Sequence, residues 1–155
     1  MPGSILDPLK SFAASLTKTY SSTLGGQPED QLKGPVQDLL RAAGSTMNFD
    51  VSSATETAVQ GAGRPDVAVG IGDLTCGYVE LKAPGLGANA KKFKGRNREQ
   101  FKKFSSTPNL LYTDSNEWVL YRQGERKTSV TLAGDVTEDA EGAVEQKNAD
   151  ELGLA

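Results

Sequence analysis

Two neighbouring strands are predicted by Arg64-Pro65-Asp66-Val67-Ala68-Val69 and, after a short turn, by Tyr78-Val79-Glu80-Leu81-Lys82. Side chains two positions apart on a strand leave from the same face, so Glu80 and Lys82 point the same way. Asp66 follows a proline at the start of the preceding strand, where it can lie beside Glu80. The two strands therefore bring one aspartate, one glutamate and one lysine to a single point.

These three residue types suit the hydrolysis of a phosphodiester. Mg²⁺ prefers oxygen ligands, which Asp66, Glu80 and the backbone carbonyl of Leu81 can supply, and Mn²⁺ can take its place. The Lys82 ammonium can contact the scissile phosphate or orient the attacking water. The alternative is structural: Asp66 caps a turn, and Glu80 and Lys82 form a surface pair worth under about 1 kcal/mol.

Composition excludes several other chemistries. The 155-residue chain suits one domain with a single core. It has no histidine, which excludes Ser-His-Asp and Cys-His catalysis. Its single cysteine, Cys76, cannot form an internal disulfide, and no apolar run is long enough for a membrane span. We therefore expect a cytoplasmic protein that does not contact a membrane.

Charge is unevenly distributed along the chain. Residues 80–127 hold eleven lysines and arginines against five acids, whereas residues 128–155 hold seven acids and one lysine. A basic centre favours phosphate binding, with DNA as the expected partner. The expected DNA-contacting residues are Lys91, Lys92, Lys94, Arg96, Arg98 and Lys102. The alternative is a solvated basic loop, and Phe93 within the run is expected to anchor in the core.

Hydrophobic spacing predicts two helices, over 5–22 and 28–44, with Gly44 as the stop of the second. Met47, Phe49 and Val51 alternate and predict a first strand.

The second half of the chain continues with a helix over 98–105, capped by Asn97, and strands over 110–113, 118–122 and 128–132. This order predicts an α/β domain over 1–133 with a mixed central sheet flanked by helices. Residues 134–155 are acidic and are expected to form a tail or an interdomain linker.

The Pro-Asp and Glu-x-Lys residues resemble the PD-(D/E)xK pattern of restriction-endonuclease-like nucleases. A narrower resemblance, over about residues 24–123, is to the N-terminal nuclease domain of bacterial restriction–modification enzymes that carry an adenine methyltransferase. The segments that carry it are Gly63-Arg64-Pro65-Asp66, Val79-Glu80-Leu81-Lys82-Ala83-Pro84-Gly85, Lys94-Gly95-Arg96-Asn97-Arg98-Glu99-Gln100-Phe101 and Pro108-Asn109-Leu110-Leu111-Tyr112-Thr113-Asp114.

That resemblance implies a Mg²⁺-dependent DNA endonuclease of restriction-endonuclease-like fold, acting in restriction–modification or phage defence. It also implies a further acid from the helix before the sheet, best matched by Glu29, and a glutamine beside the lysine, matched by Gln100. Glu29 can instead interact with its helix dipole, and Gln100 can be an exposed helix residue.

The chain has no methyltransferase motif or target-recognition domain, so either these lie on a separate partner or the chain is an excised module; a homodimer would provide two active sites. Two rival functions remain open. One is a catalytically silent DNA-binding module on the same fold, and the other is a protein–protein adaptor that binds through its acidic tail.

Overall fold

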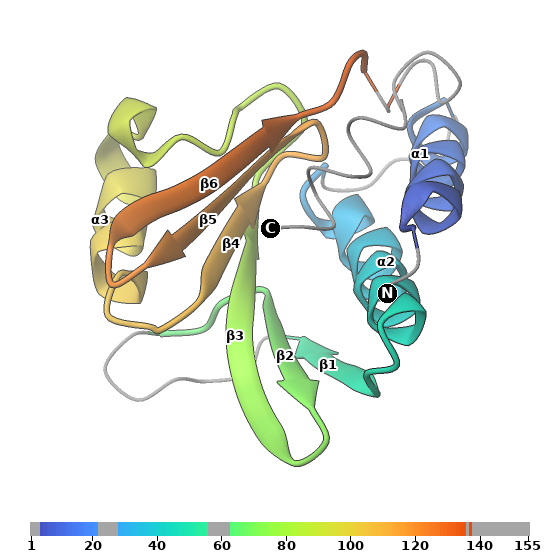
Figure 1. Cartoon of the computed structure of the whole chain (residues 1–155). Coiled ribbons are helices and arrows are strands. Elements are labelled where there is room, and N and C mark those ends of the chain that lie inside the picture. Colours follow the sequence, from blue (N-terminus) through green and yellow to red (C-terminus); the bar gives the residue numbers. More distant parts are fainter. Residues whose placement is uncertain (1–3, 22–27, 56–62, 136, 138–155) are drawn as a thin grey trace.

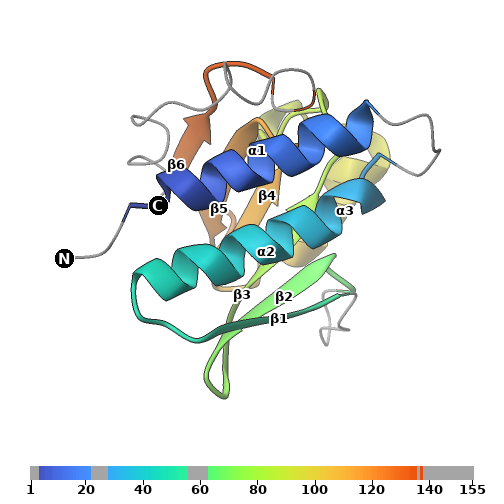
Figure 2. The same cartoon turned by 90° about the vertical axis from the view of Figure 1, so that its right-hand side faces the viewer.

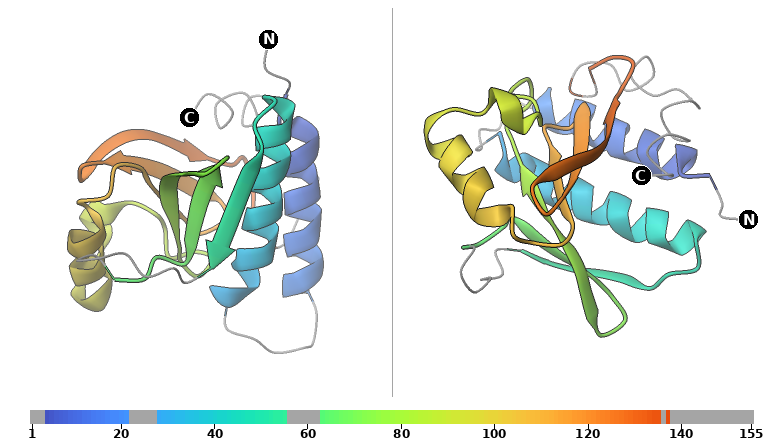
Figure 3. Two further views of the ribbon diagram at one scale, coloured as in Figure 1. Left: turned by 90° about the horizontal axis from the view of Figure 1, so that it is seen from below. Right: turned by 60° about the vertical axis from the view of Figure 1, so that its left-hand side comes forward.

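A computed structural model describes residues 4–21, 28–55, 63–135 and 137. In this part of the chain a single sheet lies between α1 and α2 on one face and α3 on the other (Figures 1 and 3). The helices are α1 (Leu6–Tyr20), α2 (Asp30–Thr46) and α3 (Gly95–Phe104), with a short 3₁₀ turn, η1 (Ala90–Lys92), before α3.

The sheet has six strands in chain order: β1 (Val51–Thr55), β2 (Val67–Ile71), β3 (Leu74–Leu81), β4 (Leu110–Thr113), β5 (Glu117–Arg122) and β6 (Glu125–Thr131). Adjacent strands are antiparallel except β3 and β4, which are parallel. A parallel pair needs a crossover, and η1 and α3 supply it. The predicted α/β class with a mixed, helix-flanked sheet is confirmed, and it agrees with the restriction-endonuclease-like fold.

One hydrophobic core joins α1 and α2 to the sheet. Helices α1 and α2 lie side by side across one face of the sheet (Figure 2). Leu9 and Leu16 of α1 and Leu32 and Val36 of α2 are fully buried, because apolar residues recur every three or four positions on the inner face of each helix. Burying each such leucine stabilises the fold by about 1.5–3 kcal/mol.

A second core, on the α3 face, is aromatic. The Phe101 and Tyr121 ring centroids are 4.8 Å apart, and those of Phe93 and Tyr112 are 5.2 Å apart. Phe93 is buried, as expected. The cluster fixes α3 against β4 and β5, so the position of α3 relative to the end of β3 is defined.

The predicted strand at Met47, Phe49 and Val51 is wrong, because the first strand begins only at Val51. Asn48 has a left-handed φ of 62°, which breaks an extended chain, and the Phe49 amide donates back to the Gly44 carbonyl at 2.9 Å. Gly44 is therefore not the helix stop but lies within the last turn of α2, which ends at Thr46.

The helix predicted to begin after Asn97 begins at Gly95, with Lys94 at its N-cap. Asn97 is therefore inside the first turn of α3, and its side-chain oxygen accepts a hydrogen bond from Lys82 Nζ instead. Of the predicted acidic tail, only residues 134, 135 and 137 fall within the described residues.

Candidate active site

Strand register places Asp66 opposite Glu80. Val67 of β2 pairs with Val79 of β3, so the residue before β2 faces the residue after Val79. The Asp66 amide donates to Glu80 Oε2 at 3.2 Å, and the Leu81 amide donates to Asp66 Oδ2 at 2.8 Å. These two bonds hold both carboxylates at the junction of β2 and β3.

Lys82 follows β3, and its amide donates to the Thr113 carbonyl at 2.9 Å, which fixes its backbone beside β4. Its Nζ donates to Gln100 Oε1 at 2.8 Å and to Asn97 Oδ1 at 3.1 Å, both on α3. Nζ also lies 3.8 Å from Glu80 Oε1. The structure thus brings Asp66, Glu80, Lys82 and Gln100 together.

Glu80 and Lys82 are buried, with only 4% and 2% of their surfaces exposed. The alternative of an exposed surface pair is therefore wrong. A buried charge is costly unless it is paired and hydrogen-bonded, and Lys82 satisfies this condition with two amide oxygens and a carboxylate. A buried ion pair contributes little net stability. Stability alone therefore does not explain why Glu80 and Lys82 are buried together.

The electrostatics of Glu80 also set it apart. Burial, followed by the negative charge of Asp66, raises the pKa of Glu80 to about 8 against the lowering effect of Lys82. In the absence of a further cation, the Glu80 carboxyl therefore tends to retain a proton at neutral pH. Perturbed carboxyls of this kind cluster at functional sites.

The donor set fits a hard divalent cation. Each carboxylate uses one oxygen to accept a backbone amide, and Asp66 Oδ1 makes no hydrogen bond within the described residues. Two carboxylates with oxygen atoms to spare are the ligands that Mg²⁺ or Mn²⁺ prefers. Lys82 lowers the Glu80 pKa but does not offset the effects of burial and of Asp66, and a divalent cation would lower that pKa further. Across the described residues, no three or more His, Cys, Asp or Glu side chains converge as a metal cluster. The predicted ligand set of Asp66, Glu80 and the Leu81 carbonyl stays a prediction.

Glu29 lies at the N-terminus of α2 and is half-buried. Its negative charge contributes, as the smallest cause, to the raised pKa of Glu80. Glu29 therefore acts on the site electrostatically, and no hydrogen bond links it to Asp66 or Glu80 in the described part of the chain. Its predicted role as a further acid stays a prediction.

Two residues of the site escaped the sequence-based prediction. Asn97 was expected to cap a helix. Its hydrogen bond with Lys82 is what shows that it belongs to the site. Asp114 lies in the β4–β5 turn, where its Oδ1 accepts the amides of Asn116 and Glu117. Its Oδ2 additionally accepts the amides of Gly85 and Gly87, which ties the loop after Lys82 to the β4–β5 turn.

The predicted DNA-contacting residues are all exposed, and they lie on η1, on α3 and on the segment between them: Lys91, Lys92, Lys94, Arg96, Arg98 and Lys102. They share the α3 face of the sheet with Lys82. Their side chains are thus free to reach a phosphate backbone.

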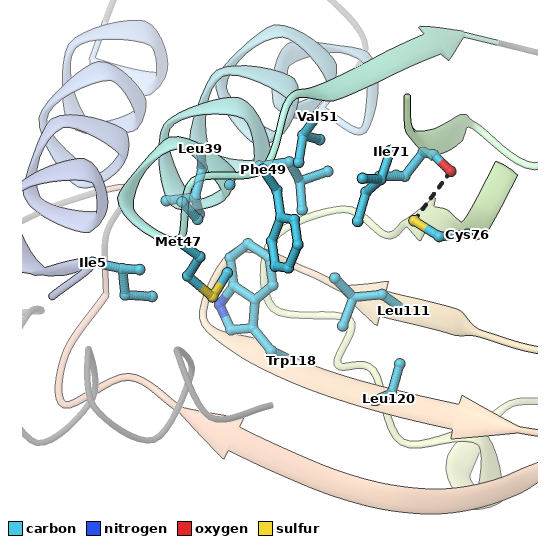
Figure 4. Close-up of a pocket in the computed structure, with 14 residues that line it drawn as sticks. Ile5, Leu39, Met47, Phe49, Val51, Ile71, Cys76, Leu111, Trp118 and Leu120 are labelled. Atoms are coloured by element: carbon cyan, nitrogen blue, oxygen red, sulfur yellow. Dashed lines mark hydrogen bonds between the residues drawn. The ribbon is translucent and has the colours of Figure 1, made fainter. Parts of the chain in front are cut away.

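An apolar cavity of about 320 Å³ lies on the other side of the sheet, between the C-terminal half of α2 and strands β1 to β5 (Figure 4). Its walls include Met47, Phe49, Ile71 and Trp118, and the Cys76 thiol donates to the Val69 carbonyl at 3.4 Å beside it. No charged side chain lines it, so it takes no part in the chemistry of the carboxylates.

The fold is similar to that of a solved protein chain. One chain of the cryo-EM structure of the DrdV–DNA complex superposes on 88% of this chain with a TM-score of 0.58 and 22% sequence identity. That likeness shows a shared fold. The match covers only 13% of the DrdV-complex chain, so this protein corresponds to a small part of that larger chain.

No family model matches the sequence. No curated protein matches it either. In the described residues, no helix combines the length and the apolar character that crossing a bilayer requires.

Proposed function

We propose that this chain is a metal-dependent DNA endonuclease domain, the cleavage module of a restriction–modification or phage-defence system. The observation that carries the proposal is the group of partly buried Asp66 with buried Glu80 and Lys82, in which a carboxylate pair adjoins an ammonium fixed by two amide oxygens. The likeness to a chain solved in complex with DNA supports nucleic acid as the partner.

Asp66 and Glu80 would hold Mg²⁺ or Mn²⁺, with the Leu81 carbonyl as a third oxygen. A bound divalent ion neutralises phosphate charge and lowers the pKa of a coordinated water. Asp66 is already oriented by the Leu81 amide, so little side-chain freedom is lost when the ion binds.

Lys82 has a separate task. An ammonium has three protons to donate, and Gln100 and Asn97 accept two of them. The third proton can be donated to a phosphate oxygen or to the attacking water. Because two acceptors from α3 fix the ammonium, it is oriented before the substrate arrives, which is the condition for efficient charge stabilisation.

The module covers only a fraction of the chain it resembles in fold, so we propose that sequence recognition and methylation are supplied by other domains or subunits. A single copy has one set of these residues, and it would cut one strand at a time. A homodimer would supply the second set.

The experiment combines two measurements: Mn²⁺ binding by calorimetry and cleavage of end-labelled duplex DNA. We expect one Mn²⁺ site that Asp66→Asn abolishes, and cleavage that EDTA and Asp66→Asn both stop. The matched control is Asp73→Asn, an exposed carboxylate at the opposite end of the β2–β3 hairpin. DNA binding without Mn²⁺ binding or cleavage would favour the catalytically silent module instead.

A further inference from the structure

A cavity of about 400 Å³ opens on the α3 face of the sheet, apart from the carboxylates. It lies between η1, α3, β5 and the start of β6, and its volume is within the range of about 300–1,000 Å³ typical of small-molecule sites. Four cationic side chains line it, and no acidic side chain does: Lys91, Arg98, Lys102 and Arg126.

The cations are available to a ligand. All four are exposed, and within the described residues Lys91, Arg98 and Arg126 form no ion pair. Among the same residues, Lys102 pairs only with Glu99, at 3.5 Å and on an exposed part of α3, and this contact contributes little stability. Four like charges around one hollow repel one another, and an anion placed between them would relieve that repulsion.

The inner wall of the same cavity is aromatic. Phe93, Phe101 and Tyr121 line it, and Phe101 is the least buried of the three. The Tyr121 hydroxyl donates to the Ala88 carbonyl at 2.9 Å and accepts the Ala90 amide at 2.7 Å, so the chain entering η1 is held in place. A phosphate alone would need no aromatic wall, whereas a base has a flat face that stacks on one.

The cavity is connected to the candidate active site through α3. Asn97 and Gln100 contact Lys82, while Arg98 and Phe101, the next residue after each, line the cavity. The Phe101 ring centroid lies 5.7 Å from that of Tyr112, and Lys82 Nζ lies 5.7 Å from the Tyr112 centroid. A strand whose phosphate lies at Lys82 can therefore have a nearby nucleotide over α3.

We infer that this cavity binds one nucleotide, with its phosphate among Lys91, Arg98, Lys102 and Arg126 and its base against Phe101. The nucleotide belongs either to a DNA strand or to a free mononucleotide, and the test separates these sources. The inference rests on the proposed function only in taking DNA as the natural source.

The test measures binding in EDTA, where no cleavage can occur, by anisotropy of a short labelled thymidine oligonucleotide. Arg98→Gln/Arg126→Gln should weaken binding about tenfold, since two phosphate contacts are lost. The matched control, Lys103→Gln/Lys127→Gln, removes the same charge from neighbouring positions of α3 and β6 that do not line the cavity. We expect it to weaken binding less than about threefold. Equal losses from both pairs would mean diffuse attraction and would overturn the inference.

The aromatic wall has its own test. The wild-type protein should bind the thymidine oligonucleotide roughly tenfold more tightly than an abasic oligomer of equal charge, and Phe101→Leu should remove most of that preference. Circular dichroism would verify that Phe101→Leu keeps the fold, and the arginine pair tests the site independently of this variant. Equal binding of the abasic oligomer by the wild type would overturn the role assigned to the base.

Titration with deoxyadenosine monophosphate, followed by NMR at the Ala90 and Gly124 amides, separates the two sources. Saturable shifts at these amides identify a free nucleotide as sufficient. Shifts with the oligonucleotide alone identify a strand, and shifts with neither overturn the inference. Cavity-dependent binding without metal-dependent cleavage would contradict only the proposed function. Metal-dependent cleavage, combined with equal losses of DNA binding from the cavity variant and its control, would contradict only this inference.

Discussion

Lys82 Nζ donates to Gln100 Oε1 over 2.8 Å, although the two residues are 18 positions apart and lie on different elements of the βαβ crossover. The bond links the end of β3 to the first turns of α3. It places a buried ammonium at a fixed point beside Glu80 and Asp66. The geometry of the candidate active site depends on it.

Removing either partner of this bond should destabilise the protein more than removing both. Gln100→Leu leaves the buried ammonium with fewer acceptors, and we expect a loss of about 1–3 kcal/mol in the free energy of unfolding. Lys82→Met/Gln100→Leu should recover part of that loss, and urea unfolding of the four-member cycle measures the coupling. Glu99→Ala on the exposed side of α3 serves as the control, with a change below about 1 kcal/mol. Strictly additive losses would contradict the account.

Stability of the metal-free protein should depend on pH through Glu80. The folded protein keeps the Glu80 proton up to about pH 8, whereas the unfolded chain releases it near the ordinary pKa of 4.5. Between these values the folded state binds more protons, so the free energy of unfolding falls as pH rises and then levels off above about pH 8.

Urea unfolding across this pH range in EDTA measures that fall, which should be on the order of a few kcal/mol. Glu80→Gln cannot ionise, so its stability should lose this component of the slope. A wild-type curve parallel to that of Glu80→Gln would contradict the raised pKa.

Asp114 should be a stabilising residue rather than a chemical one. Its carboxylate accepts four backbone amides, two in its own turn and two in the loop after Lys82. Asp114→Ala leaves these donors without their acceptor, and we expect a loss of about 2–4 kcal/mol. Thermal unfolding measures it, and Asp135→Ala is an exposed comparison. An unchanged melting temperature would show that water replaces the carboxylate.

Gly44 should tolerate no side chain. A Cβ there would lie 2.2 Å from Val51 Cγ2, at the point where the chain turns from α2 into β1. Gly44→Ala should therefore cost about 1–3 kcal/mol through overpacking. Val51→Ala removes the clashing methyl group, so Gly44→Ala should cost less in that background, as measured by urea unfolding. The same cost in both backgrounds would contradict the clash.

The part of the candidate site that depends on short-range sequence patterns could be predicted from the sequence. Asp66, Glu80 and Lys82 follow from strand alternation and one short turn, which require no knowledge of distant contacts. Gln100 was predicted only from the resemblance to restriction-endonuclease-like nucleases, because a glutamine on a helix does not by itself indicate a functional role.

The rest depends on contacts that the local sequence does not specify. Asn97 stands just before a helical pattern, where it predicts a cap, and only the packing of α3 against β4 turns it toward Lys82. Met47, Phe49 and Val51 alternate like a strand, yet the left-handed Asn48 between them ends the extended chain. The basic and aromatic cavity combines η1, α3, β5 and β6, and its residues become neighbours only in the fold.

Relaxation of supercoiled plasmid tests the central claim most directly. The wild-type protein should nick the plasmid in Mg²⁺ or Mn²⁺ and not in EDTA, and Asp66→Ala and Lys82→Ala should each lower the rate by about a hundredfold or more. Undiminished nicking by both variants, or an intact plasmid although the wild-type protein binds both metal and DNA, would contradict the proposal.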